Sequence, residues 1–258
     1  MIDDIPNVLA CDVGNAAIHV AHVCVEQVAG PLTFRTGELS PLGEALSALW
    51  QEIPEPRKVA AGSVNPAGLK ALEAAVADGL GEHVLAIGRE LPLPIATDVP
   101  EPDAVGVDRL CAAAAAFDRL GVACVVADFG TAVTVDCVSD EGVFLGGAIL
   151  PGVHLAARSL ADGTAQLPLV APCRPDWAYG RDTREAIIGG LVYGLRGALR
   201  GLVEAYATRL GHWPLVIATG GDAELICEQA GESDLIQAVV PDLVLRGVAM
   251  AYYKSLLK

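Results

Sequence analysis

The feature of this chain that most constrains its fold is a short segment that occurs twice, 116 residues apart. Residues 12–20 (DVGNAAIHV) and residues 128–136 (DFGTAVTVD) both read Asp-x-Gly followed by Asn or Thr, between apolar and β-branched stretches. This pattern is typical of a β-hairpin, and two matched hairpins about half a chain apart indicate a duplicated domain. We therefore expect one copy in residues 1–119 and the other in residues 120–258.

The segments between the hairpins alternate between strand-like and helix-like patterns, which favours an α/β fold. Asn65 and Pro66 suit the cap and the first position of a helix. Further helices are expected over residues 106–120, 183–208 and 243–257, with a buried strand over 214–218 and another helix from Asp222. The proline-rich stretch 91–103 is expected to be a loop.

Composition excludes several classes of function. The chain has 17 basic and 32 acidic side chains among 258 residues, a net charge of −15. This charge argues against nucleic acid or an anionic membrane surface as the main partner, because both require clustered Lys and Arg. No uninterrupted apolar run reaches the roughly 18 residues of a membrane span, and the first residues are acidic where a secretory signal is basic. Seven cysteines without a C-x-x-C pair favour a reducing, cytoplasmic location.

The two Asp-x-Gly turns have the composition of phosphate-binding loops. Glycine lets backbone N–H groups approach an anion, Asn15 and Thr131 add side-chain donors, and Asp12 and Asp128 suit a cation beside the phosphates. Two such turns that face each other across a cleft would hold a polyphosphate from both sides. Ordinary turn chemistry remains the alternative for either turn alone. Neither a P-loop nor a Rossmann glycine motif is present.

Two other segments carry candidate chemistry. Residues 219–222 (TGGD) follow a strand and precede a helix, which suits a nucleoside or phosphate at a helix start, or a plain connection. Asp108 and Arg109 lie in the first turn of an expected helix. They suit a general base and an anion-binding guanidinium, and the alternative is a favourable helix-start carboxylate with a solvated neighbour.

Six motifs in this order make the chain resemble the type III pantothenate kinases. They are residues 12–15 (DVGN), 106–109 (GVDR), 128–134 (DFGTAVT), 146–152 (GGAILPG), 180–183 (GRDT) and 219–221 (TGG). The resemblance extends from residue 8 to about residue 250. It implies two duplicated ribonuclease-H-like domains with an ATP cleft between them, as in the actin/hexokinase/Hsp70 fold.

The resemblance also implies a reaction and its participants. ATP would transfer its γ-phosphate to the primary hydroxyl of pantothenate, the first step of coenzyme A biosynthesis, with Mg²⁺ and a monovalent cation (K⁺ or NH₄⁺). Asp108 would accept the hydroxyl proton, Asp12 would lie near Mg²⁺, and Asp128 would hold the monovalent cation. Pantothenate would contact Gly106, Val107, Asp108, Arg109 and Thr183. ATP would contact Asp12, Val13, Gly14, Asn15, Ala16, Ala17, Ile18, His19, Thr131, Gly220 and Gly221. The family forms homodimers, so a homodimer is expected, with pantothenate at the subunit interface.

The sequence departs from the family pattern at three positions. Ala16 stands where the family has threonine, Ala21 where it has glycine, and Val99 is the nearest residue to an expected pocket tyrosine. These departures motivate an alternative, a catalytically weakened relative that binds nucleotide as a regulator. A kinase or phosphatase of the same fold with another small hydroxylated substrate is a third hypothesis. The intact Asp12 and Asp108 favour catalysis.

Overall fold

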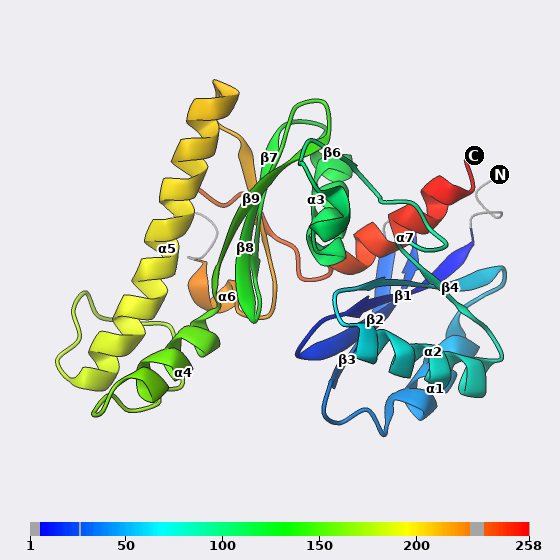
Figure 1. The fold of residues 1–258 in the computed structure, drawn as a ribbon, viewed down its shortest axis with the longest axis horizontal. Coiled ribbons are helices and arrows are strands. Elements are labelled where there is room, and N and C mark those ends of the chain that lie inside the picture. Colours follow the sequence, from blue (N-terminus) through cyan, green and yellow to red (C-terminus); the bar gives the residue numbers. More distant parts are fainter. Residues whose placement is uncertain (1–5, 26, 228–234, 258) are drawn as a thin grey trace. The chain divides into compact units, whose positions relative to one another are not determined.

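The computed structural model describes residues 6–25, 27–227 and 235–257. The chain divides into two compact units (Figure 1). Unit 1 comprises Met1–Arg119 and Asp242–Lys258, and unit 2 comprises Leu120–Pro241.

Unit 1 is built on a five-stranded sheet with the strand order β3-β2-β1-β4-β5. The strands are β1 (Asn7–Val13), β2 (Ala17–Cys24), β3 (Gln27–Arg35), β4 (Arg57–Ser63) and β5 (Val84–Ala86). The first three are antiparallel neighbours, whereas β4 and β5 continue the sheet parallel to β1. Helices α1 (Leu42–Glu52) and α2 (Pro66–Leu80) lie side by side (Figure 1) and bury their apolar stripes against the sheet.

The remaining elements of unit 1 are the segment that leads to the predicted Asp108 motif and the last helix of the chain. The proline-rich stretch contains the two-residue strand β6 (Ala96–Thr97) and the 3₁₀ turn η1 (Pro102–Ala104), and it leads into helix α3 (Val107–Leu120). The last helix, α7 (Leu243–Ser255), packs against β1, β2 and β4.

Unit 2 repeats this plan. Its strands are β7 (Cys124–Phe129), β8 (Ala132–Val138), β9 (Val143–Pro151), β10 (Leu215–Thr219) and β11 (Ala238–Val239), in the order β9-β8-β7-β10-β11. As in unit 1, β7, β8 and β9 are antiparallel neighbours, and β10 and β11 run parallel to β7. Helices α4 (Val153–Gly163), α5 (Thr183–Leu210) and α6 (Ala223–Ile226) contribute side chains to its core.

The common strand order and common strand directions confirm the predicted duplication. The two hairpin loops, however, differ in length. Asp12 pairs with His19 in unit 1, whereas Asp128 pairs with Thr134 in unit 2. The loop of unit 1 is therefore one residue longer than the loop of unit 2. The alignment of the two segments without a gap, in which His19 matches Val135, is wrong beyond the turn.

The boundary between the units differs from the expected ranges at the C-terminus. Residues 242–258 were expected in the second domain, but they belong to unit 1. Val248 and Ala251 of α7 are fully buried, and the helix contacts three strands of the unit 1 sheet. The chain returns to unit 1 because the apolar face of α7 is buried by strands that are distant from it in the sequence.

Helix α5 is 28 residues long, and by length and composition alone it is able to cross a membrane. One such helix is weak evidence for a membrane span, because long core helices have a similar composition. Here Val192, Leu199 and Val203 are buried in the core of unit 2.

Candidate active site

Asp12 lies at the end of β1, on the sheet face away from α1 and α2. The alternate residues Leu9, Cys11 and Val13 belong to the core cluster that those two helices share with the sheet. Because successive side chains of a strand point to opposite faces, the Asp12 carboxylate is directed to the other face. On that face Asp12 is the parallel cross-strand neighbour of Gly62 in β4.

Gly62 brings the start of α3 close to Asp12. A Cβ atom at Gly62 would lie 3.1 Å from Val107 Cγ1 and 3.7 Å from Cys111 Sγ. The first turn of α3, which carries Asp108, therefore covers Gly62. The electrostatics agree: burial raises the pKa of the Cys111 thiol well above its usual range, and the charges of Asp12 and Asp108 raise it further. Both predicted carboxylates thus act on one buried thiol.

The backbone before α3 leaves room for the Asp108 carboxylate. Asp108 Oδ1 accepts a hydrogen bond of 2.8 Å from the N–H of Arg109, and it lies 2.5 Å from the position that a Cβ would take at Gly106. Any side chain at residue 106 would therefore displace this carboxylate. Both Asp108 and Arg109 are half-buried.

The predicted phosphate turn of unit 1 is held through its carbonyl groups. Gly14 N–H donates to Ala17 O at 2.9 Å, Asn65 Nδ2 donates to Gly14 O at 3.2 Å, and Thr36 donates to the carbonyls of Asn15 and Ala16. Within the described residues, the N–H groups of Asn15 and Ala16 make no hydrogen bond. These two residues are also exposed, so their amides are available to an anion.

The corresponding turn of unit 2 is packed directly against the TGGD segment. Asp128 pairs with Thr219 across β7 and β10, and Gly220 follows with φ +94°. A Cβ at Gly220 would overlap Asp128 Oδ1 and lie 2.6 Å from the carbonyl carbon of Phe129. The two segments that the sequence analysis singled out independently, residues 128–131 and 219–222, are therefore in contact.

A third segment of unit 2 joins this site. Gly152 N–H donates to Thr131 O at 3.1 Å, and a Cβ at Gly152 would overlap Gly130 O. Two residues later, His154 Nε2 lies 3.3 Å from Oδ1 of Asp222. Asp222 belongs to the predicted TGGD segment, whereas His154, two residues after the motif 146–152, was not predicted as a site residue.

Thr183 is the first residue of α5 and is exposed in unit 2. Its surroundings are a capped helix start: Asp182 Oδ1 accepts from Glu185 N–H at 2.9 Å, and Glu185 Oε2 accepts from Arg181 N–H at 2.7 Å. Such a reciprocal cap fixes the first turn of the helix. The other predicted pantothenate contacts, residues 106–109, are in unit 1.

Among the residues that the structure describes, no three His, Cys, Asp or Glu side chains form a metal-binding group. A divalent ion held by one or two carboxylates, with phosphate oxygens and water as its other ligands, needs no such group. The carboxylate of Asp12 fits that mode of Mg²⁺ binding. The oxygen of Asp128 beside the glycine turn offers a hard ligand of the kind that a monovalent cation takes.

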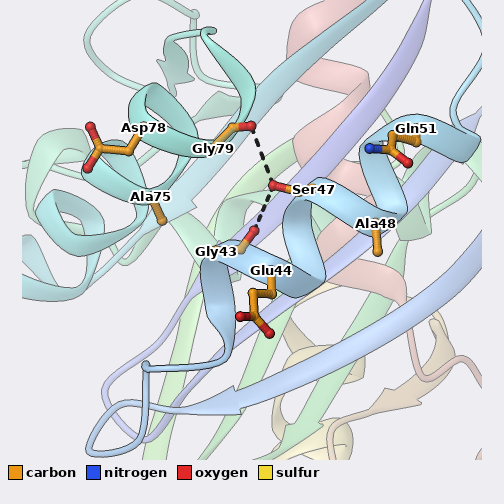
Figure 2. A pocket seen from close by; sticks show the side chains of 8 residues that line it. All are labelled: Gly43, Glu44, Ser47, Ala48, Gln51, Ala75, Asp78 and Gly79. Carbon is orange, nitrogen blue, oxygen red and sulfur yellow. Dashed lines mark hydrogen bonds between the residues drawn. The ribbon is translucent and has the colours of Figure 1, made fainter.

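A separate, open hollow of about 620 Å³ lies between α1 and α2 (Figure 2). Ser47 Oγ donates to Gly43 O at 2.9 Å and to Gly79 O at 3.4 Å along one wall. Glu44 and Asp78 give the hollow a negative charge, which does not suit a nucleotide phosphate. None of the predicted site residues lines it.

Comparison with solved structures supports the fold. A conserved Baf-family protein from Campylobacter jejuni superposes with a TM-score of 0.63 at 19% identity, over 98% of this chain and 100% of the other. The ethanolamine utilization protein EutJ from Carboxydothermus hydrogenoformans gives 0.55 at 16% identity, over 95% and 90%. At these identities the likeness concerns the fold alone. Together with the duplicated strand order, it confirms the actin/hexokinase-type ATPase fold.

Comparison with known sequences supports the family. The family model described as type III pantothenate kinase matches residues 8–205. A type III pantothenate kinase from Thermomicrobium roseum is 42% identical over 60% of this chain and 58% of its own length. Another, from Syntrophotalea carbinolica, is 36% identical over 75% and 74%. The matched part of this chain thus spans less than two thirds of the first relative and about three quarters of the second. The chain belongs to the type III pantothenate kinase family.

Proposed function

We propose that this chain is an ATP-dependent kinase that phosphorylates the primary hydroxyl of pantothenate to 4′-phosphopantothenate, the first step of coenzyme A biosynthesis. The observation that carries the proposal is the meeting of Asp12 and Asp108 around Gly62 and Cys111, beside a turn with two available amides. Family membership supports the same activity.

Phosphoryl transfer requires mainly an in-line oxygen nucleophile and neutralisation of the phosphate charge. Asp108 accepts the proton of the pantothenate hydroxyl, and Gly106 keeps space for its carboxylate. Arg109 pairs with the pantothenate carboxylate, and Val107 and Thr183 complete the contacts with this substrate. Mg²⁺ bound with ATP near Asp12 supplies charge neutralisation.

The phosphate and nucleoside contacts come from the glycine turns. Asn15 and Ala16 donate backbone N–H groups to phosphate oxygens. Thr131 contacts ATP, and Gly220 and Gly221 present backbone to the nucleotide without side-chain interference. Asp128 holds the monovalent cation, K⁺ or NH₄⁺, which adds positive charge near the phosphates.

We also place the enzyme in the cytoplasm as a homodimer, without a nucleic acid or membrane partner. Exposed apolar side chains on three elements of unit 2 support the dimer: Ile149 on β9 is 64% exposed, Leu155 on α4 46%, and Tyr193 on α5 41%. Exposed apolar side chains that lie together on a surface are usual at subunit interfaces. The net charge of −15 supports the absence of a nucleic acid partner.

The substrate assignment is tested by comparing pantothenate with its alcohol analogue, pantothenol, which has the same primary hydroxyl and no carboxylate. Mass spectrometry of the product after incubation with Mg-ATP identifies the phosphorylated compound. We expect phosphorylation of pantothenate, a KM for pantothenol at least tenfold higher, and loss of this discrimination in Arg109→Gln. Equal use of both compounds by the wild type contradicts the role of Arg109, and no phosphorylation of either contradicts the kinase.

Ala16 favours the second candidate, a nucleotide-binding regulator, because the family's threonine hydroxyl is missing from an exposed turn. A single lost hydrogen bond costs about 1–1.5 kcal/mol, roughly tenfold in affinity, which weakens a kinase without abolishing it. We therefore expect Ala16→Thr to lower the KM for ATP by up to about tenfold in an enzyme that is already active. ATP binding with no turnover in either protein favours the regulator.

A further inference from the structure

We propose that Gly247, in the C-terminal helix α7, is a positioning residue for Asp108. It allows α7 to lie directly on the backbone of α3, and this contact sets where the carboxylate of Asp108 stands relative to Asp12. The inference rests on the proposed kinase function and adds to it a residue far from the quoted family motifs, in a segment that was expected to belong to the other domain.

The contact between the two helices is unusually close. A Cβ at Gly247 would overlap the carbonyl oxygen and carbon of Cys111 and lie 2.5 Å from its Cα. These are backbone atoms, so no rotation of a flexible side chain relieves the overlap. Cys111 is three residues after Asp108, one helical turn along α3, and therefore on the same side of that helix.

The sheet fixes α3 from a second direction. A Cβ at Gly62 would lie 3.1 Å from Val107 Cγ1 and 3.3 Å from Val248 Cγ2. Gly62 is thus the point where β4, α3 and α7 meet, and it is also the cross-strand neighbour of Asp12. Leu110, Cys111 and Val248 around this junction are fully buried. The position of Asp108 therefore depends on two glycine contacts, one with the sheet and one with α7.

Helix α7 is itself anchored, so we expect an added methyl group to displace the first turns of α3. Near its end, Tyr253 Oη donates to Val23 O at 3.2 Å, and Lys254 Nζ donates to Pro94 O at 2.6 Å. Its buried face also packs against three strands of the unit 1 sheet. Helix α3 begins after a proline-rich loop and carries the catalytic base on its first turn. A displacement of about 1 Å in a reacting group can cost about a hundredfold in rate.

The test is a double-mutant cycle between Gly247→Ala and Asp108→Asn, with kcat, the KM for ATP and the urea midpoint measured for each protein. Gly43→Ala is the matched control, because it is also a helical glycine of unit 1 and has open space at its Cβ. We expect Gly247→Ala to lower kcat at least thirtyfold with the KM for ATP within about threefold. Gly43→Ala should behave as the wild type.

The decisive readout is additivity. If Gly247 acts through Asp108, the Gly247→Ala change lowers kcat little further, less than twofold, once Asp108 is Asn, because both changes remove the same function. An equal fall of kcat in both backgrounds overturns the inference, and so does an unchanged kcat in Gly247→Ala. If Gly247→Ala does not fold, Val248→Ala loosens the same junction and takes its place in the cycle, with the same two outcomes. A wild type without pantothenate-dependent turnover indicates instead that the proposed function itself is wrong.

Discussion

Gly220 is the residue at which the geometry of the unit 2 site is most directly testable. Its φ of +94° disfavours any L-residue, at a cost of about 1–2 kcal/mol. A methyl group there would also overlap Asp128 Oδ1 and crowd the Phe129 backbone at 2.6 Å. Overpacking of this kind typically costs about 1–3 kcal/mol. The Gly220→Ala variant should therefore lose about 2–5 kcal/mol of stability in unit 2.

Gly211 separates these two contributions. It ends α5 with φ +84°, and its Cβ position has no neighbour within 4 Å. Gly211→Ala should therefore show the backbone cost alone, about 1–2 kcal/mol. Urea denaturation followed by circular dichroism measures both variants.

The two variants should also differ in nucleotide binding. Gly220→Ala moves either the TGGD turn or the Asp128 carboxylate, so we expect its KM for ATP to rise at least tenfold. Gly211→Ala, which lies outside the site, should keep the KM of the wild type. Equal stability and equal KM in the two alanine variants refute the contact between Gly220 and Asp128.

Two other predictions concern Asn65 and His212. Asn65 Oδ1 accepts a hydrogen bond from Gly68 N–H at 3.0 Å, and Asn65 Nδ2 donates to Gly14 O in the phosphate turn. Asn65→Ala should therefore lower the free energy of unfolding by about 0.5–2 kcal/mol and raise the KM for ATP. Asn65→Asp should keep the cap and show only the higher KM; a wild-type KM in both variants would exclude a role in the turn. The hydrogen bond with Asp140 raises the pKa of His212 above its ordinary value of 6.5. The stabilisation of the folded state by protonated His212 is therefore complete below about pH 6.5 and is lost as the pH rises through the raised pKa. In an NMR titration, Asp140→Asn should lower the pKa of His212; an unchanged pKa contradicts the pairing.

Local signals in the sequence were sufficient for much of the fold. The Asn65-Pro66 pair predicted the start of α2, and the structure confirms both the cap and the proline at the first helical position. The two Asp-x-Gly turns predicted both hairpins and the duplication. The helix start and each hairpin turn depend on residues close together in the chain. For the helix start the physical causes, the fixed φ of proline and side-chain capping, act within a few residues.

The prediction that was wrong and the contacts that were not predicted both depend on residues that are distant in the sequence. The return of α7 to unit 1 requires its buried face to meet β1, β2 and β4, which no local pattern records. The glycines of the site show the same limit: Gly220 reads as a turn residue, and only the fold shows that it touches Asp128. His154 is exposed and lies outside every quoted motif. It approaches Asp222 because the turn after β7 holds both segments: Gly152 N–H donates to Thr131 O, and Asp222 N–H donates to Phe129 O.

The central claim is that Asp108 is the base of a pantothenate kinase, and ADP release from Mg-ATP tests it most directly. The assay is run with and without pantothenate, in K⁺ and again in Na⁺, for the wild type and for Asp108→Asn. We predict turnover that requires pantothenate, is faster in K⁺, and falls about 10²–10⁴-fold in Asp108→Asn while ATP still binds. Turnover that is unchanged in Asp108→Asn, or an absence of pantothenate-dependent turnover in a wild type that binds ATP, contradicts the account.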